Sequence, residues 1–136
     1  MRLWSKQLIP ALPRKQLLGQ WRECCLIAKG IKENGTPNHI LVNRVMDYPI
    51  EHFVNYTLRV VLECEKRGYR INTGIFTKYF NFDDYKAILT DDIFPEWHNQ
   101  RYLRQCFYNL QEKRDVNGIS QDEWYEILQV VRGVVL

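Results

Sequence analysis

The chain has 136 residues, of which 46% are hydrophobic and 26% are charged, and its formal net charge is +3. This length suits one domain, residues 1–136, with a sizeable core, and the composition excludes a disordered chain. The mild positive charge permits an anionic partner without requiring one.

Helical spacing of apolar residues recurs along most of the chain. In chain order, helical segments are predicted at residues 12–32, 39–46, 49–67, 85–89, 96–114 and 121–131. Gly35 and Gly68 are suited to end the first and third of these, and Ser120 with Glu123 forms a capping box for the last. Strand signals are too short to support a sheet. We therefore predict an all-α fold: a single compact helical domain with three long helices and shorter ones.

Several classes of protein are excluded by what the sequence lacks. No apolar run approaches 18 residues, and Arg2, Lys6, Arg14 and Lys15 interrupt any signal-peptide core, so we expect a cytoplasmic protein with no membrane contact. The four cysteines and three histidines show no metal-ligand spacing, and no glycine-rich phosphate loop occurs. We expect no metal, no cofactor, and reduced, mostly buried thiols.

The N-terminal quarter is strongly basic but contains one acid, Glu23. Residues 1–32 carry seven cations, at positions 2, 6, 14, 15, 22, 29 and 32. The positions three and four away from Glu23 on a helix hold no cation, so helix spacing gives it no ion-pair partner. Three explanations stay open for Glu23: an ion-pair partner from another part of the fold, simple solvation, or a catalytic role.

The start of the chain is a second candidate for chemistry. An α-amino group has a reference pKa of about 7.7–8.0, against about 10.4 for lysine, so more of it is the neutral nucleophile at pH 7. An amine that attacks an aldehyde is well placed there. Every chain has such a group, so this observation alone is weak evidence.

Two motifs give the chain a resemblance to a known family. The triplet Trp21-Arg22-Glu23 resembles a family motif, an aromatic residue followed by Arg and Glu at the same distance from the start of the chain. Residues 63–69 resemble a second family motif, an ECxKRG-aromatic signature at the end of a long helix. Both belong to the pyrimidine-dimer DNA glycosylase/AP-lyase family, the phage endonuclease V-like proteins. Residues 1–25 fit the opening run of the bacterial branch of this family almost throughout.

The resemblance implies a DNA-repair enzyme that acts on damaged double-stranded DNA without a cofactor. It implies that an N-terminal amine forms an imine at C1′ of the sugar, with Glu23 catalytic and Arg22 on the DNA. Arg2 is too large for the usual removal of the initiator methionine, so the amine would be that of Met1. Leu26 stands where the phage enzyme has a second arginine. We expect a monomer.

The basic helix supplies the expected DNA contacts. Lys15, Arg22 and Lys29 are seven residues apart, so they share one helix face, and we predict that these side chains and Arg2 bind DNA. Two alternatives stay open: a non-catalytic helical module that binds nucleic acid, and a helical protein-interaction domain.

Overall fold

The computed structural model describes residues 1–134, and these form an all-α fold with no strand among them, as predicted. Five α-helices are joined by loops that contain four 3-10 helices. Their bounds are η1 Lys6–Ala11, α1 Arg14–Asn34, η2 Asn43–Asp47, α2 Ile50–Lys66, α3 Gly74–Thr77, η3 Phe82–Asp84, η4 Thr90–Asp92, α4 Gln100–Asp115 and α5 Gln121–Val131.

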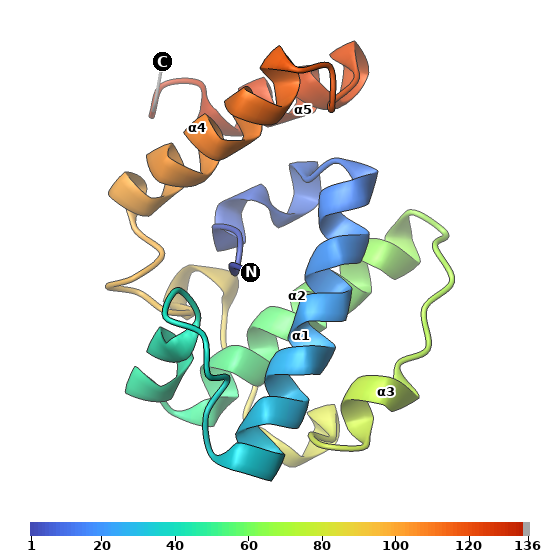
Figure 1. Cartoon of the computed structure of the whole chain (residues 1–136), viewed down its shortest axis with the longest axis vertical. Helices are drawn as coiled ribbons and strands as arrows, with labels where there is room; N and C mark the ends of the chain where they lie inside the picture. The colour runs from blue at the N-terminus through green and yellow to red at the C-terminus, as the bar shows by residue number, and fades with distance from the viewer. Residues whose placement is uncertain (135–136) are drawn as a thin grey trace.

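The long helices enclose the core from three sides. Helices α1 and α2 pack on each other, α4 pairs with α5, and η1 lies against α5 and α2 (Figure 1). The predicted apolar stripes form this core. Leu17, Trp21 and Cys24 of α1, for example, are at most 5% exposed. All four cysteines are buried, as expected, and none of them forms a disulfide in the structure.

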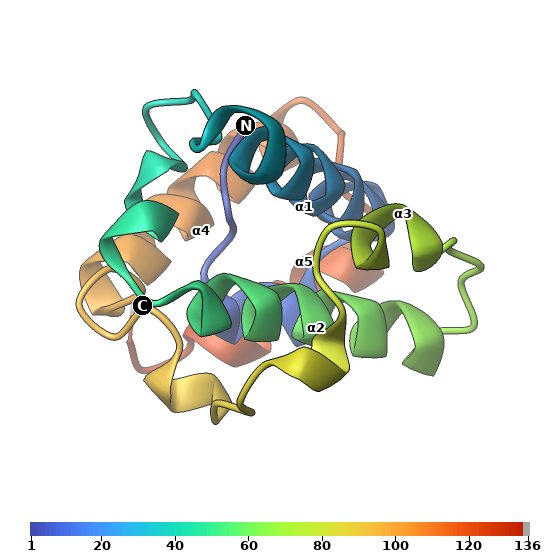
Figure 2. The same cartoon turned by 90° about the horizontal axis from the view of Figure 1, so that it is seen from below.

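The first residues of the chain run through the interior instead of lying on the surface. From below, this segment passes between α1, α2 and α4 (Figure 2). Leu3 and Ser5 are fully buried and Trp4 is 7% exposed, while Met1 is exposed at 39%. The fold therefore clamps residues 3–6 and leaves the chain start at the surface.

The helix ends follow the sequence signals closely. Helix α1 begins after Pro13 and ends at Gly35, whose φ of 79° places it in the left-handed region. Helix α2 ends in a Schellman arrangement, in which Tyr69 N–H donates to the Cys64 carbonyl and Gly68 has a φ of 78°. The predicted capping box of Ser120 and Glu123 is present at α5.

One prediction was wrong: residues 85–89 form no helical turn but an extended connection between η3 and η4. The cause is a side chain of α2. Asn55 donates to the Lys86 carbonyl at 2.8 Å and accepts from Ile88 N–H at 2.9 Å. Because Asn55 satisfies these backbone groups, they need no helix.

Two other predicted helices are shorter than the sequence suggested. Residues 39–42 form a turn, and only Asn43–Asp47 is helical, as a 3-10 helix. Helix α4 begins at Gln100, not at Glu96, because Asn99 caps it by accepting from Tyr102 N–H at 2.9 Å. Residues 95–97 form a turn instead, in which Trp97 N–H and His98 N–H both donate to the Phe94 carbonyl, at 3.1 and 2.7 Å.

Candidate active site

Side chains from α4 and the preceding turn hold the N-terminal segment by its backbone. The Tyr102 hydroxyl donates to the Leu3 carbonyl, Ser5 N–H points at Cys106 Sγ at 3.4 Å, and Lys6 N–H donates to His98 Nδ1 at 3.0 Å. Burial raises the pKa of Tyr102, so its hydroxyl remains a neutral donor. These contacts fix the path of residues 3–6.

Lys6 serves the same anchoring role with its side chain. It is only 5% exposed, and its ammonium donates to the carbonyls of Asp91 and Ile93 at 2.6 and 2.7 Å. Burial lowers the pKa of Lys6, while the carboxylates of Asp91 and Asp92 act in the opposite direction. Because both carbonyls already occupy this amine, its geometry is that of a structural tie.

Gln20 joins the N-terminal segment to α1. Its amide donates to the Arg2 carbonyl at 2.9 Å, and its Oε1 accepts from Trp4 N–H at 2.7 Å. The Tyr56 hydroxyl lies 2.6 Å from the Trp4 carbonyl oxygen and 2.9 Å from Gln20 Oε1, and donates to this pair of acceptors. Gln20 is 1% exposed. A buried amide that holds the backbone of both Arg2 and Trp4 fixes the path of this segment.

The chain start and Glu23 meet in one depression of about 260 Å³. Its wall consists of Met1, Arg2, Trp4, Glu23, Leu41, Asn109 and Lys113. Glu23 Oε2 accepts from Arg2 N–H and from the Gln20 amide, both at 3.4 Å. Two neutral N–H groups therefore orient the carboxylate, and one of them belongs to Arg2, the residue next to Met1.

Glu23 has no cationic partner of the kind that an ordinary ion pair requires. Within residues 1–134, no Lys, Arg or His nitrogen lies within 4.0 Å of its carboxylate. It is half-buried, so it is neither fully solvated nor fully desolvated.

The four expected DNA-binding residues do not gather at one point. Arg2 lies beside Met1 and Glu23, and its guanidinium sits 5.5 Å from the centre of the Trp4 ring. Lys15, Arg22 and Lys29 are exposed along α1. The arrangement is an exposed row of cations along α1, the helix that also carries Glu23.

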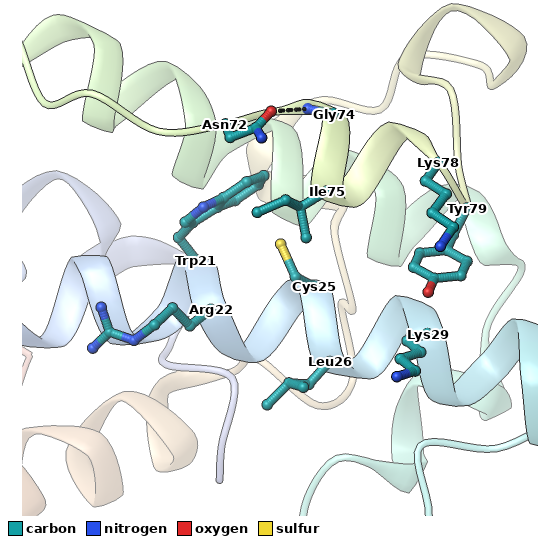
Figure 3. Close-up of a pocket in the computed structure, with 10 residues that line it drawn as sticks. All are labelled: Trp21, Arg22, Cys25, Leu26, Lys29, Asn72, Gly74, Ile75, Lys78 and Tyr79. Carbon is teal, nitrogen blue, oxygen red and sulfur yellow. Dashed lines mark hydrogen bonds between the residues drawn. The ribbon is translucent and has the colours of Figure 1, made fainter.

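A larger cavity, of about 680 Å³, opens between α1 and α3. Figure 3 shows Trp21 and Cys25 pointing towards Ile75 of α3, with Arg22 and Lys29 at opposite ends of the α1 side. Neither Met1 nor Glu23 lines this cavity. We place the candidate chemistry in the smaller depression because Met1 and Glu23 both line it.

The second motif of the sequence forms a structural clamp. Arg67 Nε donates to Glu63 Oε2 at 2.7 Å, and its two terminal nitrogens donate to the carbonyls of Leu12 and Pro10 at 2.7 and 3.1 Å. These contacts tie the end of α2 to the junction of η1 and α1. The motif therefore supports the start of α1 and lies outside the depression.

Sequence reasoning missed several residues of this site. Asn109 and Lys113 line the depression from α4, and their spacing of four residues on a predicted helix was an available signal. Gln20 was also recognisable, because it is a polar residue next to the apolar stripe. Tyr56 and Tyr102 carried no such signal, since their spacing is that of ordinary core residues. The fold and site together define a class: a helical protein whose N-terminal amine and one carboxylate share a depression beside a cationic helix face.

A family model described as pyrimidine dimer DNA glycosylase matches residues 1–77. This match covers more than half of the chain, so the protein belongs to the pyrimidine dimer DNA glycosylase family, a family of DNA-repair enzymes. Both motifs, Trp21-Arg22-Glu23 and residues 63–69, fall inside the matched range. No curated protein and no solved structure gave a match to the chain.

Two features are absent from the described residues. No cluster of three or more His, Cys, Asp or Glu side chains within residues 1–134 could hold a metal ion. No helix in the same range is both long and apolar enough to cross a membrane.

Proposed function

We propose that this protein is a DNA glycosylase/AP lyase whose nucleophile is the α-amino group of Met1. The observation that carries this proposal is the shared depression of Met1 and Glu23, at the end of a backbone segment clamped by Gln20, Tyr56 and Tyr102. Effective amine catalysis requires that the nucleophile be held near its target, and a clamped chain start provides this.

The proposed reaction uses the amine and one carboxylate. The neutral amine attacks C1′ of the damaged nucleotide, the N-glycosidic bond breaks, and the base leaves with a proton. Ring opening gives an iminium between Met1 and C1′, which the negative charge of Glu23 stabilises. Loss of a C2′ proton then expels the 3′ phosphate by β-elimination, and water releases the enzyme. We assign the movement of these protons to Glu23, because a carboxylate near the reacting atoms can act as general acid and base.

The charges around the depression suit a DNA substrate. Arg2 and Lys113 line it, and Arg22 and Lys29 continue the positive surface along α1. Cations of this kind neutralise phosphates irrespective of sequence. A damaged nucleotide costs less to extrude from the stack than an intact one, and this difference provides selectivity for the lesion.

Borohydride reduction of a mixture of the enzyme with abasic DNA tests the proposal. A covalent adduct is expected, and mass spectrometry should place the sugar on the amine of Met1. A duplex with a cyclobutane pyrimidine dimer should give the same adduct after base release. An adduct at Lys6 would disprove the N-terminal assignment but leave a lyase. If no substrate gives an adduct, the protein is a binding module, and a salt-dependent binding assay then separates a nucleic-acid module from a protein-interaction domain.

A further inference from the structure

The loop between α1 and α2 exposes two adjacent aliphatic side chains. Ile40 is 84% exposed and Leu41 is 50% exposed, whereas Val42 and Val45, close behind them, are buried at 0% and 1%. Single exposed aliphatic residues are common on protein surfaces. Two adjacent exposed aliphatic residues at the tip of a loop, which Val42 and Val45 anchor in the core, are less common than single ones.

Hydrogen bonds hold this tip in a fixed conformation. The Asn43 side chain accepts from His39 N–H at 2.9 Å, and the His39 carbonyl accepts from Val42 and Asn43 N–H at 3.0 and 2.8 Å. His39 Nδ1 accepts from Leu41 N–H at 3.2 Å. With Val42 in the core, the backbone of the tip is held in place, so its ordering would cost little on binding.

The tip stands beside the proposed reaction site. Leu41 lines the depression of Met1 and Glu23. Ile40 and Leu41 also line an adjoining cavity of about 370 Å³ with two cations and aromatic side chains; the rest of its wall is Arg2, Arg44, Trp97, Tyr102, Gln105, Tyr108 and Asn109. The Arg44 guanidinium lies 5.1 Å from the centre of the Trp97 ring. Arg2 and Arg44 therefore lie beside the exposed pair Ile40 and Leu41, close to Met1.

We propose that Ile40 and Leu41 form a wedge that enters the base stack of duplex DNA beside the target nucleotide. This inference rests on the proposed function, which requires C1′ of a stacked nucleotide to reach Met1. Aliphatic side chains inserted between base pairs replace lost stacking contacts, and flanking cations bind the phosphates on either side. The wedge would hold the stack open while the nucleotide occupies the depression.

The test compares Ile40→Ala with Leu89→Ala, a matched control. Leu89 is 74% exposed and lies on the loop between η3 and η4. Rates of borohydride trapping are measured on an abasic duplex and on the same abasic strand alone, which has no paired stack to open. We expect Ile40→Ala to lower the ratio of duplex rate to single-strand rate by about tenfold, as the loss of one buried aliphatic contact. Leu89→Ala should keep the wild-type ratio.

A second readout does not require chemistry. A 2-aminopurine placed next to the abasic site brightens when it unstacks, so wild-type binding should raise its fluorescence and Ile40→Ala should remove most of the rise. Wild-type values of both the rate ratio and the fluorescence in Ile40→Ala would overturn the wedge and leave the lyase intact. If the wild-type protein traps neither substrate, the proposed function fails, and the fluorescence rise alone then decides whether the tip enters the stack.

Discussion

The backbone N–H of Arg2 lies 3.4 Å from Oε2 of Glu23, a residue 21 positions further along the chain. Glu23 therefore contacts the residue that directly follows Met1, the residue with the α-amino group. Gln20 strengthens the arrangement, because its amide donates both to the Arg2 carbonyl and to the same carboxylate oxygen. The chain start is thus placed by α1, and the relation between amine and carboxylate is part of the fold.

Glu23→Gln should keep the fold and DNA binding but lose strand cleavage. A glutamine oxygen can still accept from Arg2 N–H, whereas the charge that stabilises an iminium is gone. We expect cleavage of abasic DNA to fall by about 10²–10⁴-fold. Single-turnover cleavage, with binding measured by anisotropy, gives both quantities. Glu33→Gln, an exposed change on the same helix, is the control. Unaltered cleavage, or a large fall in melting temperature, would make Glu23 a structural residue.

An N-terminal extension should abolish the covalent adduct. Two added residues move the free amine by up to about 7 Å, which takes it out of reach of a sugar held at Glu23. The measurement is borohydride trapping with a Gly-Ser extension before Met1. The matched control is the same protein after an exact proteolytic removal of the extension. DNA binding should persist in both, since no cation is removed. Equal trapping with the extension in place would point to a lysine nucleophile.

Removal of the cations on α1 should weaken DNA binding at all sequences alike. Lys15, Arg22 and Lys29 are exposed on that helix. Each charge that contacts a phosphate contributes about one to the slope of log K against log salt, so the triple alanine variant should lose up to about three. Titrations at several salt concentrations measure this slope. Lys86→Ala, on the loop after η3, removes an exposed charge elsewhere. A triple variant with the wild-type slope would exclude this face as the binding surface.

The sequence was sufficient for the helices that have a clear apolar period and a clear stop. Helix α2 was predicted within one residue at each end, because Pro49 and Gly68 bracket it. Prediction from the sequence failed where a side chain from another helix forms the hydrogen bonds of the backbone. Asn55 holds residues 86–88 in an extended path, and nothing near those residues in the sequence reveals it. The buried path of residues 3–6 was missed for the same reason, since its partners are spread along the chain, from Gln20 to Tyr102 and Cys106.

The site was predictable only in its charged members. Glu23 stood out as a single acid among cations, and the chain start has its own chemistry. Their meeting in one depression depends on Gln20 and Tyr56, whose polar atoms are used entirely inside the core. Lys113 came from a helix 90 residues further along. A local pattern can indicate which groups are reactive, whereas their distances depend on contacts that the local sequence does not encode.

Arg67→Ala should destabilise the protein and spare the chemistry. The side chain makes three hydrogen bonds, one to Glu63 and two to carbonyls at the junction of η1 and α1. Hydrogen bonds to charged groups contribute about 1.5–3 kcal/mol each at most, and this side chain is partly exposed, so we expect a loss of about 2 kcal/mol. Urea unfolding measures this loss. Arg70→Ala, exposed three residues later, should be nearly neutral. If the variant cleaves more slowly at a temperature where it is fully folded, Arg67 has a role in the reaction.

The last prediction concerns acid sensitivity and the buried His98. Its Nδ1 accepts from Lys6 N–H at 3.0 Å, and the ring is 3% exposed. Burial lowers the pKa of His98 well below its usual value, and the charges of Lys6 and Arg44 act in the same direction. Burial also lowers the pKa of His52, whose Nδ1 accepts from Phe94 N–H at 3.0 Å. Both rings are therefore neutral in the folded protein at pH 7.

In the unfolded chain each histidine takes up a proton near pH 6.5. Below that pH the unfolded state binds more protons than the folded state, so the free energy of unfolding falls as the pH drops, by up to about 1.4 kcal/mol per pH unit for each such histidine. Urea unfolding between pH 7.5 and 5.5 should show this slope. His98→Asn keeps an acceptor for Lys6 N–H, so the variant should be less stable overall but show a shallower slope. If its slope equals that of the wild type, His98 is not the acid-sensitive group, and His52→Asn should then remove the dependence.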